Sequence, residues 1–255
     1  MLDERARRFN LRNILVVAQV ALSLILLIAA RLFLRSAQQS QAIDPGFTAE
    51  RVLTVPLNIN LLRYTRAQSR EFFRQVIERV EGVPGVQQAS LARVVALSGV
   101  ASVRSLLIEG KTGPDDQFRS EGTGTGGSNP NSVNSNVIGL NYFQTMGIAL
   151  LRGRDFTAQD SEDRPRVAVV NEAFVRQHFE GQEAVGRRLS FNGVRGPRQE
   201  IVGVVQDSKY VTLGEGPTAM VYVPLGQNQE SGMTLHARVA GAPGGVIAAV
   251  RREVQ

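Results

Sequence analysis

The 255-residue sequence contains no cysteine and no tryptophan, and only two histidines. The missing cysteine excludes disulfide bonds, cysteine-ligated zinc and a thiol nucleophile. His178 stands beside Phe179 in a helical pattern, and we interpret it as a partly buried surface residue rather than a ligand. His236 shares a strand face with Thr234 and Arg238, and nothing in the sequence links the two histidines.

Recognised motifs of catalysis are missing as well. The sequence contains neither a G-x-S-x-G nucleophile elbow nor an H-E-x-x-H metalloprotease motif. Its densest carboxylate cluster lacks the glycine and final glutamate of a calcium-binding EF-hand loop, so we interpret it as a solvated turn. The cluster consists of Asp155, Asp160, Glu162 and Asp163. These absences predict a protein that is not an enzyme and that holds no metal or cofactor.

The charge pattern argues against a nucleic-acid partner. The net charge is +6, but the basic residues are interleaved with acids, and aromatic residues make up only 6% of the chain. A nucleic-acid-binding surface normally combines a basic stripe with aromatic residues that stack on bases. The sequence lacks this combination, so we expect no binding of nucleic acid.

What the sequence does contain is a long apolar run from Ile14 to Leu34. As a helix it would extend about 31 Å, which matches the hydrocarbon core of a bilayer. Its single charge, Arg31, lies one turn from the end and can reach the lipid headgroups. We therefore predict a transmembrane helix at 14–34. Two alternatives remain open: a signal peptide, whose apolar core spans only about 7 to 15 residues, and a buried core helix, which rarely lacks a polar face over so many turns.

Arginines on both sides of this run indicate its orientation. They are Arg5, Arg7, Arg8 and Arg12 before it, and Arg31 and Arg35 at its far end. The positive-inside rule places the more basic side, residues 1–13, in the cytoplasm as a juxtamembrane segment, although the two arginines at the far end dilute the bias. Residues 35–45 would then form an extracytoplasmic stalk, followed by an extracytoplasmic domain.

One face of the predicted span carries polar and small residues. Gln19 and Ser23 lie four residues apart, and Ala30 continues the same face. Inside a bilayer, polar groups at this spacing can hydrogen-bond to a second helix, and small residues allow close approach. We expect this face to contact another span; the alternative is that Gln19 bonds only to its own backbone.

The remainder of the chain has the mixed periodicity of an α+β domain. Strand patterns at Arg51–Asn60 and Val86–Val95 flank an amphipathic helix at Thr65–Glu81, which predicts a βαβ unit. Gly110–Asn131 is rich in Gly, Ser, Thr and Asn and lacks apolar periodicity, so we expect a mobile loop. Further strands are expected at 132–138, 148–151, 166–170, 188–191, 200–206, 219–223 and 234–239, and helices at 140–146, 171–179 (with Asn171 as its cap) and 246–254.

The run from Leu15 to Leu27, followed by Leu34-Arg35-Ser36, resembles the first span of MacB/FtsX-type ABC transporter permeases. The stretch from Asp44 to Phe47 resembles the start of their periplasmic core domain. Further matching stretches lie at 83–86, 142–147, 151–156, 169–173, 185–189, 201–207 and 222–225. The resemblance covers nearly the whole chain and is strongest to the duplicated orphan permeases of acidobacterial type.

The resemblance implies a fold class. It is α+β, with one N-terminal transmembrane helix followed by a porter-like βαβ subdomain that is interrupted by a mixed α/β, sabre-like subdomain. The porter-like subdomain would comprise 46–95 and 232–255, and the sabre-like subdomain 96–231. The second half of the porter-like subdomain would be incomplete and the family's further membrane spans are missing, so we expect a chain truncated after the core domain.

The resemblance also implies a function. In the family the permease does no chemistry itself, because a separate cytoplasmic ABC ATPase drives it. The chain would be a non-catalytic permease subunit, or a fragment of one, in the bacterial inner membrane, and its extracytoplasmic domain would transmit motion or contact partners. Expected partners are the membrane, other permease spans or a second permease copy, the ATPase and a periplasmic protein. The alternative is a membrane-anchored extracytoplasmic sensor or binding module; a secreted enzyme is disfavoured by the missing motifs.

Overall fold

The computed structural model describes residues 11–41, 44–48, 50–59, 64–109, 132–191, 196–241 and 244–254. The loop expected at 110–131 lies outside these residues. The chain divides into two units, residues 1–44 and residues 45–255. In chain order the elements are α1 Leu11–Gln41, β1 Val52–Asn58, α2 Arg66–Glu81, β2 Val86–Ala92, β3 Val103–Ser105, β4 Leu107–Ile108, β5 Ser132–Ile138, α3 Tyr142–Met146, β6 Leu150–Gly153, β7 Val167–Asn171, α4 Glu172–Phe179, β8 Arg188–Ser190, β9 Gln199–Val205, β10 Met220–Pro224, η3 Leu225–Gln227, β11 Gly232–Val239 and α5 Gly244–Val254.

The first unit contains one long helix. α1 runs for 31 residues without interruption, so the helix continues beyond the apolar run into the segment expected to be a stalk. Within it, Asn13–Arg35 has a mean hydropathy of 2.5 and none of it is buried. In the part of the chain that the structure describes, this is the one helix long and apolar enough to cross a membrane.

The side chains expected to face another span, those of Gln19, Ser23 and Ala30, are exposed on α1. Their contact with a neighbouring helix stays a prediction. Of the flanking arginines, Arg31 and Arg35 are exposed on α1, Arg12 lies in its first turn, and Arg5, Arg7 and Arg8 lie outside the described residues.

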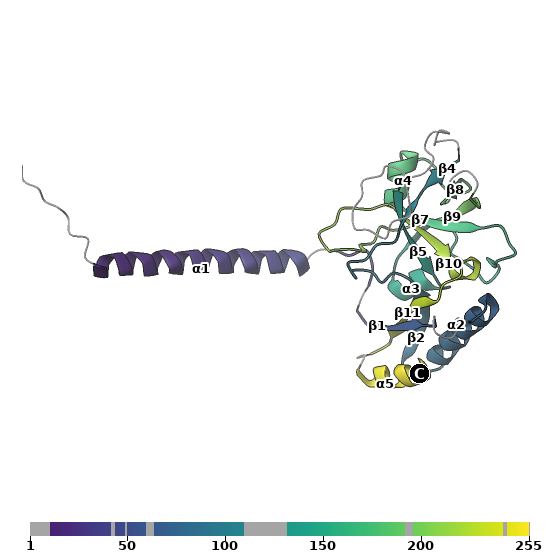
Figure 1. Cartoon of the computed structure of the whole chain (residues 1–255), viewed down its shortest axis with the longest axis horizontal. Coiled ribbons are helices and arrows are strands. Elements are labelled where there is room, and N and C mark those ends of the chain that lie inside the picture. Colours follow the sequence, from purple (N-terminus) through teal and green to yellow (C-terminus); the bar gives the residue numbers. More distant parts are fainter. Residues whose placement is uncertain are drawn as a thin grey trace, which may run out of the picture. The chain divides into compact units, whose positions relative to one another are not determined.

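The second unit is built on one eleven-stranded sheet (Figure 1). Its strands follow the order β1-β11-β2-β5-β10-β7-β9-β8-β4, with β3 added to β5 and β6 added to β9. β11 pairs antiparallel with both β1 and β2. β1 and β2 therefore run parallel, as the predicted βαβ unit requires, but with β11 between them. The α+β class expected from the sequence is confirmed.

α2 covers one face of the three strands β1, β11 and β2. It begins with a capping box, in which Thr65 Oγ1 accepts from the Gln68 N–H and Gln68 Oε1 accepts from the Thr65 N–H. Its buried side chains, Phe73, Val76 and Val80, pack in a core that these strands share. Figure 1 shows α2 and α5 next to β1, β2 and β11.

Successive side chains of β11 point to opposite faces of the sheet, as its sequence predicts. Leu235 and Ala237 belong to the core under α2 and α5. His236 faces the other side of the sheet, where it is fully buried and its ring meets that of Tyr142 in α3 edge-on, with 5.6 Å between centroids. The predicted placement of His236 opposite Leu235 and Ala237 is confirmed.

Two further cores fill the rest of the domain. One packs α4 against β7, β9 and β10, and the other surrounds α3. α4 begins as predicted at Asn171, whose Oδ1 accepts from the Phe174 N–H at 3.0 Å. The same oxygen accepts from the Met220 N–H at 2.9 Å, which ties the start of the helix to β10.

The buried imidazole of His236 is held neutral. Its Nδ1 lies 3.0 Å from the Thr234 carbonyl oxygen, and because that oxygen can only accept, Nδ1 carries the proton. Among the described residues, His236 Nε2 has no hydrogen-bond partner. Burial lowers the pKa of His236 from 6.5 to about 4, against the smaller opposing effect of the Thr234 carbonyl.

Acid should therefore destabilise the domain through His236. The stabilisation is complete above pH 6.5, the pKa in the unfolded chain, and is lost as the pH falls toward about 4, because only the unfolded chain binds the proton in that interval. Between about pH 7.5 and about pH 5, this residue alone should lower the free energy of unfolding by about 2 kcal/mol.

Urea unfolding followed by circular dichroism at both pH values measures this effect. His236→Leu should lose this part of the pH dependence. His178→Leu, the matched change at the other histidine, should retain it. The same pH dependence in His236→Leu as in the wild type would contradict the argument.

Candidate functional site

The two halves of the sheet, β1-β11-β2 and the strands from β5 to β4, meet at a narrow junction. Across it, the described parts of β2 and β5 share a single register pair, Ala92 with Ile138. The Asn136 side chain extends the junction, because its Oδ1 accepts from the Val94 N–H at 2.9 Å and its Nδ2 donates to the Val94 carbonyl at 2.8 Å. The amide of Asn136 thus bonds to Val94 as a neighbouring peptide group would.

A groove of about 580 Å³ opens beside this junction, between α2 and the loop 157–163; we name it the α2 cleft. Its volume lies within the range of about 300 to 1,000 Å³ that is usual for ligand pockets. Its apolar lining comes from Phe73, Ile77, Leu91, Ile138, Leu140 and Leu225, and its charged rim from Arg70, Arg74, Glu78, Glu81, Glu162 and Asp163. The combination of an apolar lining with a charged rim makes the α2 cleft the candidate functional site.

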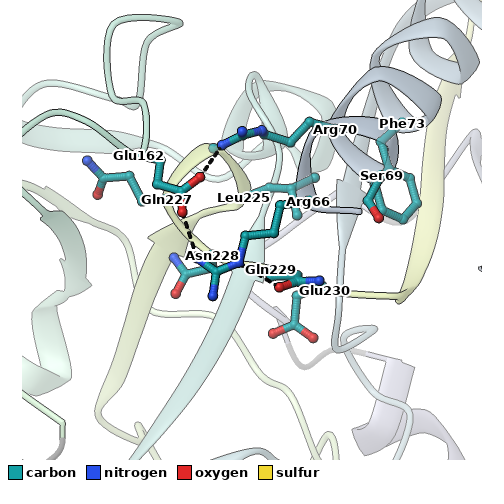
Figure 2. A pocket seen from close by; sticks show the side chains of 11 residues that line it. Arg66, Ser69, Arg70, Phe73, Glu162, Leu225, Gln227, Asn228, Gln229 and Glu230 are labelled. Atoms are coloured by element: carbon teal, nitrogen blue, oxygen red, sulfur yellow. Dashed lines mark hydrogen bonds and ion pairs between the residues drawn. The ribbon is translucent and has the colours of Figure 1, made fainter. Parts of the chain in front are cut away.

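Glu162 bridges the α2 cleft at one end (Figure 2). Its Oε1 accepts from Arg66 Nη1 at 2.6 Å and its Oε2 from Arg70 Nη1 at 2.7 Å, and both arginines belong to α2. Hydrogen bonds from Arg66 and then Arg70 hold the pKa of Glu162 below its usual value. Because all three side chains reach solvent, these ion pairs contribute little to stability. They nevertheless connect α2 to the loop 157–163.

A small pocket adjoins this bridge and is lined in part by the same three residues, Arg66, Arg70 and Glu162 (Figure 2). Arg66 Nε also donates to Gln229 Oε1 at 2.8 Å, so the segment after η3 is held to α2 as well. The pocket encloses about 20 Å³, which is room for about one water molecule. A ligand larger than a water molecule would not fit this pocket, whereas the α2 cleft has room for one.

The loop that carries Glu162 is fixed from inside by Asp160, whose side chain is only 7% exposed. Its carboxylate accepts from the Thr157 N–H at 2.8 Å and from both Nη atoms of Arg154 at 2.8 and 2.9 Å. Burial alone would raise the pKa of Asp160, but the bonds from Arg154 and Thr157 outweigh it and lower the pKa. The prediction of a solvated turn is therefore wrong for Asp160, because its carboxylate is buried and accepts the bonds from Thr157 and Arg154 that hold the loop. It is correct for Asp163, which is exposed.

The structure does not bring the two histidines together. His178 lies half-buried on α4, as expected, with its ring centroid 4.6 Å from that of Phe174. His236 is enclosed in β11, and neither residue lines the α2 cleft. Across the described ranges, no group of three or more histidines and carboxylates could hold a metal ion.

Asp160→Asn should loosen the loop 157–163. The amide keeps one acceptor oxygen but loses the charge-assisted bonds to Arg154 and Thr157, which should lower the free energy of unfolding by about 1 to 2 kcal/mol. Hydrogen–deuterium exchange should rise at the amides of the loop. Asp163→Asn is the matched control, because it removes an exposed carboxylate from the same loop, and it should change neither quantity. Equal exchange in the two variants would exclude an anchoring role for Asp160.

Comparison with known proteins adds a family and two solved structures. A family model described as the MacB-like periplasmic core domain matches residues 14–255. The periplasmic region of MacB from Actinobacillus actinomycetemcomitans is similar at 16% sequence identity, with 80% of this chain and 81% of that chain covered and a TM-score of 0.49. The extracellular domain of the noncanonic ABC-type transporter YknZ from Gram-positive bacteria is similar at 15% identity, with 79% of this chain and 90% of that chain covered and a TM-score of 0.45. No curated protein matches the sequence.

Proposed function

Because the chain belongs to the family of MacB-like periplasmic core domains, we propose that it is a non-catalytic permease subunit, or a fragment of one, of an ABC-type transport or mechanotransmission system. The observation that carries this proposal is the extent of the family match. The match begins at residue 14 and so includes the apolar part of α1 together with the α+β domain. The proposal of a membrane subunit depends on this apolar helix, since the α+β domain alone would not support it.

The proposed location is the bacterial inner membrane. The span would be 14–34, with residues 1–13 in the cytoplasm, residues 35–45 as a stalk, and the α+β domain outside. The excess of arginines before the span supports this orientation, and the periplasmic description of the family agrees with it.

Within the domain, the proposed division is a porter-like subdomain, 46–95 with 232–255, and a sabre-like subdomain, 96–231. The narrow junction between β2 and β5 supports this division, since little of the sheet ladder crosses it. The α2 cleft lies beside the junction and is bridged by the exposed ion pairs of Glu162. A hinge movement of one subdomain would therefore open or close the α2 cleft with a small change in free energy, and in this way the domain would transmit motion.

The proposed partners are a separate cytoplasmic ABC ATPase, further permease spans or a second permease copy, and a periplasmic protein. The face of α1 formed by Gln19, Ser23 and Ala30 would contact the neighbouring span. A membrane-anchored sensor or binding module is the second candidate function. The α2 cleft is the observation that favours it, because its volume suits a ligand.

Purification of the affinity-tagged chain from membranes of its own organism tests the transport proposal. We expect a second polypeptide with an ABC ATPase sequence to copurify in mild detergent and to hydrolyse ATP in a reaction that orthovanadate inhibits. The chain purified alone from another host should neither bind nor hydrolyse ATP, and adding back the ATPase should restore hydrolysis. A chain that associates with no ATPase but changes its state when a ligand binds would favour the sensor instead.

Single cysteines test the orientation, because the natural chain has none that would interfere. A membrane-impermeant maleimide should label Gln182→Cys, an exposed position in the domain, in intact spheroplasts. Leu2→Cys should react only after the membrane is permeabilised, and both variants should react in detergent. The reverse order of labelling would place the domain in the cytoplasm and contradict the proposal.

A further inference from the structure

The α2 cleft contains an open strand edge. On the side away from β11, the described part of β2 joins another strand only through Ala92. Two bonds beside the junction show which backbone groups point to that side. The Gly139 N–H donates to the Leu91 carbonyl at 2.7 Å, and the Arg93 N–H donates to the Val137 carbonyl at 2.9 Å.

Alternate residues of a strand direct their N–H and C=O groups to the same edge. Since Leu91 and Arg93 point away from β11, Ala89 also points away from it. The alternation does not extend to Gln87, because the pairing of β2 with β11 shifts register at that residue. Ala89 lines the α2 cleft, so this edge opens into the cleft rather than toward another strand.

A side chain occupies the place where a neighbouring strand would bond. The Ala89 N–H donates to Glu81 Oε1 at 3.2 Å. Glu81 is the last residue of α2 and is exposed, so its carboxylate can exchange this bond for water at little change in free energy. The edge of β2 is thus covered by a group that a competing peptide could displace.

The walls of the α2 cleft suit the side chains of an extended peptide. Phe73 and Ile77 of α2 line it together with Leu140, which follows β5, and Leu225 in η3. Leu140 is 43% exposed, so part of this apolar wall is in contact with water. An aliphatic side chain in the cleft would remove this surface from water.

The charged rim of the α2 cleft selects for basic groups. Its two arginines are already paired, Arg70 with Glu162 and Arg74 with Glu71 and Glu78. Glu81 and Asp163 have no lysine or arginine partner among the residues that the structure describes. A ligand that carries a lysine or arginine therefore complements the charge that remains.

From these observations we propose that the α2 cleft binds an extended, basic peptide segment of a partner protein, which adds to the open edge of β2. Main-chain bonds to Ala89 set its register, and Glu81 is displaced from the Ala89 N–H. Aliphatic side chains of the peptide pack against the apolar walls, and a lysine or arginine meets the acidic rim. The inference rests on the proposed function in that it names a partner for the same cleft, but peptide binding can be measured without an ATPase.

Selection of phage-displayed random dodecapeptides on the full chain in lipid nanodiscs tests this inference. Enriched peptides should be basic, with aliphatic residues at alternate positions. N-methylation of the amides that face β2 should weaken binding of an enriched peptide by about tenfold or more, because it removes main-chain hydrogen bonds and keeps the side chains. The amide of Ala89, which donates to Glu81 in the free chain, should become more protected from hydrogen exchange in the complex.

A pair of matched variants locates the binding site. Leu140→Arg should weaken binding at least about tenfold, because it places a charge in the apolar wall of the cleft. Leu151→Arg changes a leucine of similar exposure, 45%, that lies on β6 outside the cleft, and it should leave binding unchanged.

Three results would overturn the inference: no peptide enriched on the wild-type chain over Leu140→Arg, enrichment of acidic or helical peptides, or binding that N-methylation leaves intact. None of them bears on whether an ABC ATPase copurifies with the chain. Failure of this inference and failure of the proposed function are therefore distinguishable.

Discussion

The insertion of β11 between β1 and β2 is the constraint on which the domain depends. Seven register pairs join β11 to β1 and six join it to β2. The first and last parts of the domain sequence therefore share one core with α2 and α5. Forming this core requires closure of the whole segment between β2 and β11, and such distant pairing is slow compared with local contacts. His236 lies in the middle of β11, so burial of its neutral ring is part of closing the sheet.

The strands from β5 to β4 are joined to this core by buried bonds at one place and by exposed ion pairs at another. On one side of the α2 cleft, the backbone pair of Ala92 with Ile138 and the bonds from Asn136 are shielded from water. On the other side, Glu162 reaches α2 through ion pairs that solvent screens. Buried bonds are costly to break and exposed ion pairs are not. A firm joint next to a weakly closed cleft is the arrangement that the proposed hinge movement requires.

Periodicity predicted most of the elements because it reports which face of a segment is buried. The strand expected at 132–138 has the observed bounds, and Asn171 caps α4 as expected. Thr65, expected as the first residue of a helix, is the cap of α2. Periodicity does not predict β3 and β4. They have three and two residues, which is too few to show an alternation of buried and exposed side chains, and they are strands only because they pair with neighbouring strands. The strand order and the α2 cleft were missed for a related reason. The spacing of Arg66 and Arg70 puts them on one helix face, but only the folded chain brings Glu162 to them.

Asn171 couples the start of α4 to β10. Its Oδ1 accepts from Phe174 at the start of α4 and from Met220 at the start of β10, and its Nδ2 donates to the Thr218 carbonyl at 2.9 Å. The cap of α4 is therefore shared with a strand that comes 49 residues later. α4 has only eight residues, which is too few for a helix to persist alone in water. We therefore expect α4 to gain its full stability only when β10 has docked beside it.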